Sequence, residues 1–205
     1  MADIDFLKRQ YYVSALGLTE AQAVRMTIND LEHEFFSTAS PTISGTGSPE
    51  GVIAAPVGSY YTDTAITNGA MRWAKKSGAG NTGWVCSDGD TGWREVSSLL
   101  VNGWTGLVYV KRTPELLTIQ VEGLSAAAAT DATVLTLPVG FRGPAIGTGA
   151  RMVFHTTTTS LRRFILNSSG VLSYLPAVPE AVTLYGQSFT PPSISWSTTL
   201  PGTSA

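Results

Sequence analysis

From residue 59 to the last residue, the chain consists of short apolar runs separated by Gly, Pro, Asn and Ser, and this pattern restricts its fold more than any other feature. Runs this short, broken this often, are typical of β-strands joined by turns, because helices need longer uninterrupted segments. In the run 116–122 apolar and polar residues alternate, which predicts a strand with one face in water. Strands are predicted at residues 59–63, 70–75, 107–112, 116–122, 133–137, 151–155, 161–167, 171–174 and 182–189.

The composition, the charge balance and the lengths of the apolar runs argue against several classes of protein. The chain has 13 Lys and Arg against 15 Asp and Glu, whereas a nucleic-acid binder needs a basic face for the phosphates. No apolar run approaches the roughly 18 residues of a membrane span, so we expect no insertion into a membrane. Acidic Asp3 and Asp5 stand where a secretion signal would have basic residues, which predicts a chain without export. The single cysteine, Cys86, excludes an internal disulfide, and we expect it to be a small buried filler.

Residues 1–36 differ from the rest of the chain and predict short helices. Asp5 and Thr27 are suitable N-cap residues, and apolar side chains recur at three-to-four-residue spacing after each. A segment of this size cannot enclose a core by itself. Two interpretations stay open: a helical hairpin folded onto its own β-domain, or an anchor whose aromatic face another protein covers. The candidate anchoring residues are Phe6, Leu7, Tyr11, Tyr12, Leu16, Ile28, Leu31, Phe35 and Phe36.

The composition predicts three further regions, which make the chain mostly β. Residues 37–58 are rich in Gly, Pro, Ser and Thr and predict an extended linker. Residues 59–106 predict a small Trp-rich β-module, in which Asn68 and Gly69 form the turn of a hairpin. Residues 107–205 predict an antiparallel β-sandwich of the jelly-roll kind that ends in an irregular, Pro-containing tail.

Six aromatic residues are concentrated between positions 60 and 104 of the sequence, within the predicted β-module. Such rings serve as platforms for sugar rings and as anchors at protein interfaces, but they also build the cores of small β-modules. Both interpretations stay open for each ring. The six candidates for ligand or trimer contacts are Tyr60, Tyr61, Trp73, Trp84, Trp93 and Trp104.

The sequence contains no recognisable catalytic or metal-binding constellation. Its two histidines, His33 and His155, are far apart, and no spacing is typical of a zinc site. The segment 88–90 has half the pattern of a calcium loop and is interpreted as a turn. Hydrolysis of glycans needs only two carboxylates, but the available ones form no acidic cluster. We therefore expect no catalytic residue, metal or cofactor; the carboxylates considered are Asp88, Asp90, Glu95, Glu115 and Glu122.

A series of motifs runs in order along residues 47–175. It comprises GSPEGVIAAPVGSYYTDT at 47–64, NGA at 68–70, WAKKSG at 73–78, NTGW at 81–84, GDTGWR at 89–94, NGW at 102–104, LVYVKR at 107–112 and LPVGFR at 137–142. These motifs resemble a module of virion fibre and minor tail proteins of tailed bacteriophages, above all those that infect actinobacteria. LPVGFR resembles the LPxGFRP signature of their C-terminal β-domains, except that Gly143 stands before Pro144. Tyr11-Tyr12 and residues 28–32 are similar to short virion-anchoring segments.

The resemblance implies a non-enzymatic, homotrimeric structural protein on the virion surface. It would be a head fibre or capsid decoration, or a tail fibre or minor tail protein, made in the host cytoplasm. Its N-terminus would attach to phage capsid or tail proteins, and its β-domain would face the host, with cell-wall glycan as the candidate ligand for attachment.

Three other hypotheses remain open. A polysaccharide-degrading tail spike usually carries repetitive β-helices longer than 205 residues accommodate. A decoration protein could stabilise the capsid without binding any receptor. A cellular carbohydrate-binding module is disfavoured, because the sequence shows no export signal.

Overall fold

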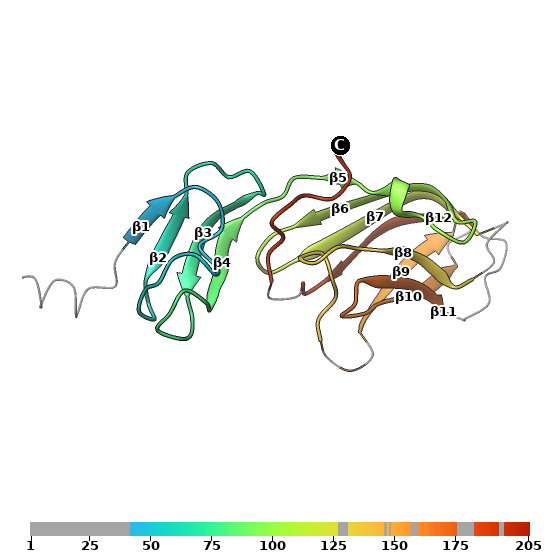
Figure 1. Ribbon diagram of the computed structural model, residues 1–205. Coiled ribbons are helices and arrows are strands. Elements are labelled where there is room, and N and C mark those ends of the chain that lie inside the picture. Colours follow the sequence, from blue (N-terminus) through green and yellow to red (C-terminus); the bar gives the residue numbers. More distant parts are fainter. Residues whose placement is uncertain are drawn as a thin grey trace, which may run out of the picture. The chain divides into compact units, whose positions relative to one another are not determined.

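The computed structural model describes residues 42–126, 131–145, 147, 149–156, 160–175, 183–192 and 195–205, which apart from Thr42 lie in one compact unit, Ile43–Ala205. This part is mostly β, as the sequence predicts, and none of its helical segments is long and apolar enough to span a membrane. The predicted helices of residues 1–36, with all nine candidate anchoring residues, lie outside it. Figure 1 shows the elements: β1 (Thr42–Gly45), β2 (Tyr60–Asp63), β3 (Ala70–Lys75), β4 (Trp84–Gly89), β5 (Arg94–Glu95), the 3₁₀ helix η1 (Ser97–Leu99), β6 (Thr105–Arg112), β7 (Leu117–Ser125), β8 (Thr133–Thr136), β9 (Ala150–Thr156), β10 (Leu161–Leu166), β11 (Val171–Leu175), β12 (Thr183–Thr190) and β13 (Thr203–Ser204).

The first sheet is small and has the strand order β1-β2-β3-β4. Strands β2 and β3 pair antiparallel, with Tyr61 opposite Trp73, and the turn between them contains Asn68 and Gly69. The predicted hairpin is thus confirmed. One face of this sheet packs onto a core formed by Ala55, Tyr61, Ala70, Trp73, Trp84, Cys86 and Trp196.

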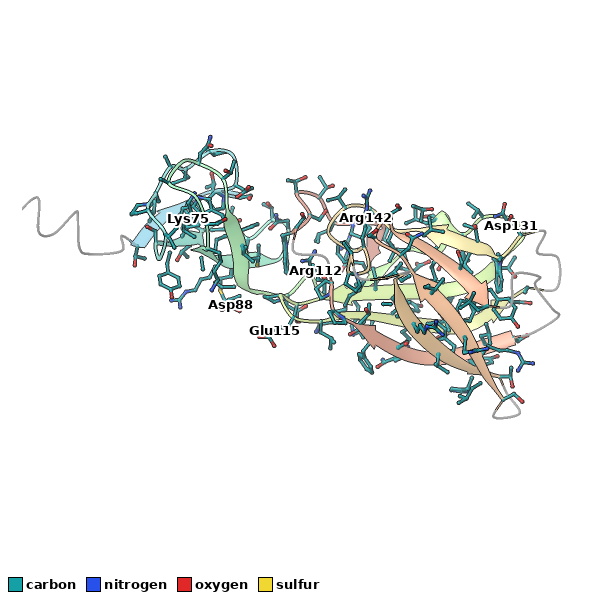
Figure 2. The ribbon with its side chains drawn as sticks, turned by 90° about the horizontal axis from the view of Figure 1, so that it is seen from below. Lys75, Asp88, Arg112, Glu115, Asp131 and Arg142 are labelled. Carbon is teal, nitrogen blue, oxygen red and sulfur yellow. The ribbon has the colours of Figure 1, made fainter. Side chains whose placement is uncertain are left out.

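Lys75, at the end of β3, is buried although it is charged (Figure 2). Its ammonium group donates hydrogen bonds to the carbonyl oxygens of Gly80 and Thr82 and lies 5.6 Å from the centre of the Trp84 ring. Carbonyl oxygens and an aromatic face replace the water that the ammonium group loses on burial. Lys75 therefore holds the loop between β3 and β4 in place.

Part of the predicted linker, residues 37–58, is described from β1 onward, and it is hydrogen-bonded to the small sheet. The carbonyl oxygen of Gly45 accepts a hydrogen bond of 2.8 Å from the N–H of Thr64. The carboxylate of Glu50 accepts one of 2.7 Å from the N–H of Trp84, at the start of β4.

The second sheet has nine strands in the order β13-β5-β6-β7-β12-β9-β10-β11-β8. Strands β12 and β9 pair over two residues only, and the sheet curls there so that its two halves share one core. Leu100, just after η1, forms a β-bridge with Leu135 of β8. The segment that follows β5 therefore contacts β8, the edge strand at the other end of the strand order. The core is formed by Val96, Trp104, Val108, Val110, Leu117, Ile119, Val121, Leu124, Ala126, Val134, Leu135, Leu137, Phe141, Met152, Phe154, Phe164, Leu166, Leu172, Tyr174 and Leu184.

Strand β7 has the wet and dry faces that the alternation at 116–122 predicts. Leu117, Ile119 and Val121 are fully buried, whereas Glu122 is exposed. The polar side chains of this strand therefore lie on the side of the sheet that faces away from the core.

A bulge follows in β7: Thr105 and Leu107 of β6 lie opposite Ser125 and Glu122, so β7 has one residue more than β6 between these two pairs. Gly106 has a φ of 120°, and a Cβ atom there would lie 2.5 Å from the carbonyl oxygen of Gly123 in β7. Only glycine fits both the backbone angle and this close approach. Because of the extra residue in β7, the side chain of Leu124 lies in the core. It stands three residues after Val121, so strict alternation would turn it away from the core.

The C-terminal tail inserts into the core of the small sheet. Trp196 is 7% exposed, and its indole N–H donates a hydrogen bond of 3.0 Å to the carbonyl oxygen of Asn68. The side-chain amide of Asn68 in turn donates one of 2.9 Å to the carbonyl oxygen of Ser197. A few residues later, β13 pairs with β5 of the large sheet. The tail, predicted to be irregular, is thus a structural connection between the two cores.

Arg112, at the end of β6, holds this tail (Figure 2). It is 2% exposed, and its guanidinium donates hydrogen bonds to the carbonyl oxygens of Gly140 and Ser195 and lies 4.7 Å from the ring centre of Trp196. Burial lowers the pKa of Arg112 to about 10, which leaves the group protonated at neutral pH.

Candidate functional site

Four of the six aromatic side chains singled out in the sequence are buried in the two cores. Tyr61, Trp73 and Trp84 belong to the small core. Trp104 belongs to the large core, where its ring centre lies 6.2 Å from that of Phe164 and 5.8 Å from that of Tyr174. None of these four side chains is more than 4% exposed. The two candidates that remain accessible are Tyr60, which is 52% exposed, and the partly exposed Trp93.

The LPVGFR segment, residues 137–142, builds a turn that receives the tail. The N–H of the buried Phe141 donates a hydrogen bond of 3.0 Å to the carbonyl oxygen of Pro138. Gly140 has a φ of 96°, and a Cβ atom there would lie 2.5 Å from the backbone nitrogen of Ser197. The glycine of this motif is therefore required for packing against the tail.

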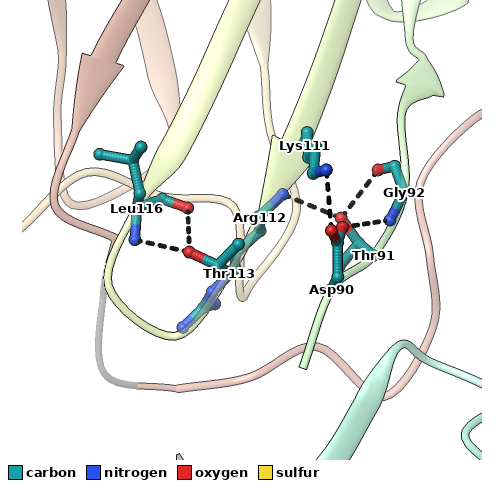
Figure 3. A network of polar contacts seen from close by, with 7 residues as sticks. All are labelled: Asp90, Thr91, Gly92, Lys111, Arg112, Thr113 and Leu116. Carbon is teal, nitrogen blue, oxygen red and sulfur yellow. Dashed lines mark hydrogen bonds and ion pairs between the residues drawn. The ribbon is translucent and has the colours of Figure 1, made fainter. Parts of the chain in front are cut away.

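The carboxylate of Asp90 has structural partners, which Figure 3 shows. It accepts a hydrogen bond of 2.8 Å from the N–H of Gly92 and forms an ion pair of 2.7 Å with Lys111. Next to it, the hydroxyl of Thr91 accepts a hydrogen bond of 2.9 Å from the N–H of Arg112. These contacts account for Asp90 as part of the turn between β4 and β5, which its ion pair with Lys111 connects to β6. Within the described ranges, no three His, Cys, Asp or Glu side chains are arranged to hold a metal ion.

Cys86 is buried in the small core, as expected. Burial raises the pKa of its thiol from 9.0 to about 11. We expect Ellman's reagent at pH 8 to react about a hundredfold more slowly with the folded protein than with the protein in urea, because only the thiolate attacks. Rapid reaction of the folded protein would contradict this placement.

The raised pKa of the Cys86 thiol predicts that the stability of the fold depends on pH. The folded thiol keeps its proton to higher pH than the unfolded one, so ionisation favours the unfolded chain. The stabilising contribution of the neutral thiol is therefore present below pH 9.0 and is lost as the pH rises to about 11. Wild type and Cys86→Ala should diverge over this interval in urea titrations.

A row of polar and aromatic side chains crosses four strands of the large sheet on the side away from its core. Tyr109 of β6 lies opposite Glu95 of β5 and opposite Gln120 of β7. On the other side of Gln120 lies Gln187 of β12. A second row runs beside the first. We call the two rows together the outer face; its residues are Glu95, Tyr109, Gln120, Gln187, Leu107, Glu122, Tyr185 and His155.

Hydrogen bonds and stacking order the side chains of the outer face. The amide N–H of Gln187 donates a hydrogen bond of 2.6 Å to the amide oxygen of Gln120. The amide N–H of Gln120 donates one of 2.8 Å to Glu122. Tyr185 and His155 are stacked, with ring centres 6.4 Å apart and an interplanar angle of 28°. These contacts hold exposed polar groups in fixed positions on a rigid sheet.

A shallow groove of about 270 Å³ opens at one end of the outer face. Trp93, just before β5, and Tyr109 contribute two partly exposed rings, and Gln120 and Glu122 contribute an amide and a carboxylate. We call this the Trp93 groove; its remaining lining residue is Ala205. The arrangement combines apolar ring faces with hydrogen-bonding groups, as in sites that bind small polar ligands.

A second hollow, of about 330 Å³, lies beside the small sheet. Trp73, Trp84 and Trp196 line it, and all three belong to the small core. The indole N–H of Trp84 is already bound to the carbonyl oxygen of Ile53 at 2.8 Å, and that of Trp196 is bound to Asn68. The indole N–H of Trp73 has no hydrogen-bond partner among the described residues. We prefer the Trp93 groove as the candidate binding site because its two rings are partly exposed, whereas the three rings of this hollow are buried in the small core.

Trp93 was predicted from the sequence as a candidate, and Gln120 and Glu122 were predicted to lie on a wet face, whereas Tyr109, Tyr185 and Gln187 were not predicted. The signal for Tyr109 was present, because it lies between apolar Val108 and Val110 in the run 107–112. The pairing of Gln120 with Gln187 joins positions 67 residues apart, and no local pattern shows it.

No family model matches this chain, and no curated protein or solved structure was found to be significantly similar to it.

Proposed function

We propose that this protein is a structural protein of a tailed-bacteriophage virion, a surface fibre of the capsid or tail that is anchored by residues 1–36 and attaches to the host through its β-rich unit. The outer face is the observation that best supports attachment. It presents tyrosines to solvent together with glutamines and a carboxylate that hydrogen bonds hold in place. The ordered motifs of residues 47–175 support the virion assignment.

The role that we propose is binding, without catalysis, metal or cofactor. Two of the carboxylates considered for glycan hydrolysis are engaged in contacts that suit a scaffold. Asp90 is paired with Lys111, and Glu122 accepts a hydrogen bond from Gln120.

We further propose that the fibre is a homotrimer and that the large sheet acts as a jelly-roll-like sandwich within it, joined through the extended segment 37–58 to a helical anchor. Exposed apolar side chains on the large sheet support association. Leu161 is 68% exposed, Phe189 55% and Val153 40%. Apolar groups like these favour contact with another protein surface.

The assignment is tested on the full chain and on virions. Light scattering should give a mass three times the 21.6 kDa of one chain. Immunogold microscopy of the phage whose genome encodes this sequence should label the particle surface. A monomer that is absent from particles would overturn the proposal. Labelled particles that adsorb normally without the protein would favour a capsid-stabilising decoration, and release of reducing ends from host polysaccharide would favour a spike.

Deletion of residues 1–40 tests the anchor. We expect the shortened chain to remain a folded trimer, because among the described residues none before Ile43 forms or packs against the two cores. It should fail to enter particles, since the apolar side chains of the anchor would be missing. Incorporation at the wild-type level would show that residues 1–36 are not the anchor.

A further inference from the structure

We infer that the Trp93 groove binds uncharged glycans. This inference makes the proposed attachment function more specific and rests on it. Three properties of the groove support this ligand class: its ring faces, its fixed amide and carboxylate, and its charge.

The rings suit the apolar faces of sugars. Trp93 stands just before β5, two residues from Glu95, and Glu95 lies opposite Tyr109 of the adjacent strand β6. Adjacent strands are about 4.8 Å apart, and residues two apart in a strand point to the same side. Both rings are partly exposed and line one groove. Positions related diagonally in this way lie about 7–8 Å apart, and two rings at such a separation can contact one sugar ring or two successive ones.

The polar groups suit hydroxyls. The oxygen of Gln120 is bound to Gln187, and one of its N–H groups is bound to Glu122 Oε1. These bonds determine which end of the Gln120 amide donates. Among the described residues, Glu122 Oε2 has no donor, so a second N–H of Gln120 and this oxygen present a donor beside an acceptor. One hydroxyl of a sugar can accept a hydrogen bond from the N–H of Gln120, and a neighbouring hydroxyl can donate one to Oε2 of Glu122.

The charge selects uncharged glycans and disfavours a second copy of this chain as the occupant. Glu122 lines the groove and Glu95 lies opposite Tyr109, whereas no Lys or Arg is among the lining residues. A carboxylate repels uronic and sialic acids. It is also costly to bury against a protein, because the cores of protein interfaces are depleted of charge. Hydroxyls can satisfy the carboxylate without removing all its water.

Titration of the full-length protein with defined oligosaccharides tests this inference. The probes are maltotetraose, cellotetraose, chitotetraose and a β-1,4-linked galactotetraose, with tetragalacturonate as the charged comparison. Calorimetry should detect at least one neutral probe at or below about 10 mM, as is usual for single weak contacts that a trimer would multiply. Tetragalacturonate should bind at least about tenfold more weakly, or about 1.4 kcal/mol.

Variants locate the binding. Trp93→Ala and Gln120→Leu should each lower the affinity for the best neutral probe about tenfold or more. Trp93→Phe keeps a ring and should retain most of the affinity. Tyr60→Ala is the matched control, because Tyr60 is an exposed aromatic residue on the small sheet outside the groove. It should bind like wild type. Thermal unfolding of each variant confirms that it is folded.

Four results would overturn the inference. They are no binding of any neutral probe at about 10 mM, preference for tetragalacturonate, equal losses in Trp93→Ala and Tyr60→Ala, or a change of oligomeric mass in Trp93→Ala, which would make the groove an interface between copies. None of these results bears on the proposal that the protein is part of a virion, which immunogold labelling tests. Conversely, a chain that binds glycan but is absent from particles would overturn the fibre proposal alone.

Discussion

Replacement of Trp196 by Ala is expected to lower the free energy of unfolding by about 3–5 kcal/mol, the usual cost of removing a large buried ring. Trp196 fills the core of the small sheet, and its N–H is bound to the carbonyl oxygen of Asn68. The substitution leaves a cavity and an unpaired acceptor, and it removes the aromatic surface that faces the guanidinium of Arg112. The tail would lose its main contact with the small sheet.

Urea unfolding followed by far-ultraviolet circular dichroism measures this effect. Trp93→Ala is the matched control, because it deletes the same side chain from a partly exposed position. It should cost less than about 1.5 kcal/mol, since water already reaches that ring. Equal losses in the two variants would show that Trp196 does not connect the tail to the small core.

Replacement of Arg112 by Met is expected to cost about 2–4 kcal/mol. Methionine keeps much of the apolar stem but donates no hydrogen bond, so the carbonyl oxygens of Gly140 and Ser195 lose their donor. A buried acceptor left unsatisfied costs about 1–3 kcal/mol, and relief from burying a charge offsets part of the loss. The turn around Gly140 and the tail should loosen together.

Arg94→Met provides the matched comparison. Arg94 also donates to carbonyl oxygens of the tail, those of Pro201 and Gly202, but it is only partly buried. Water can replace its hydrogen bonds, so we expect a loss below about 1 kcal/mol. Hydrogen exchange should show faster opening around Gly140 in Arg112→Met than in Arg94→Met. The same rates in both would indicate that burial of Arg112 does not matter.

Local patterns predicted nine of the described strands but not β1, β4, β5 or β13. The alternation at 116–122 identified both faces of β7, and Asn68-Gly69 identified the hairpin of β2 and β3. Both features depend on neighbouring residues, because side chains alternate along a strand and a tight turn requires particular backbone angles. The burial of Cys86 was predicted correctly for the same reason, since it stands in a short apolar strand.

The candidate site could be predicted only in part. Gln120 and Glu122 were expected in water, but nothing local shows that Gln187 pairs with Gln120 or that Trp93 lies beside Tyr109. The role of the tail was likewise hidden, because Trp196 lies among Ser, Thr and Pro residues that are typical of irregular segments. Its partner Asn68 is 128 residues away in the sequence.

The amino-acid sequence by itself therefore determined most of the strands, the two faces of β7 and the tight turn at Asn68-Gly69, since these depend on side-chain period and on backbone angles over a few residues. Tertiary structure alone decided which strands became neighbours, which rings were buried and which remained at the surface. The reason is that burial depends on what packs against a side chain, and in this molecule the packing partners come from distant parts of the chain.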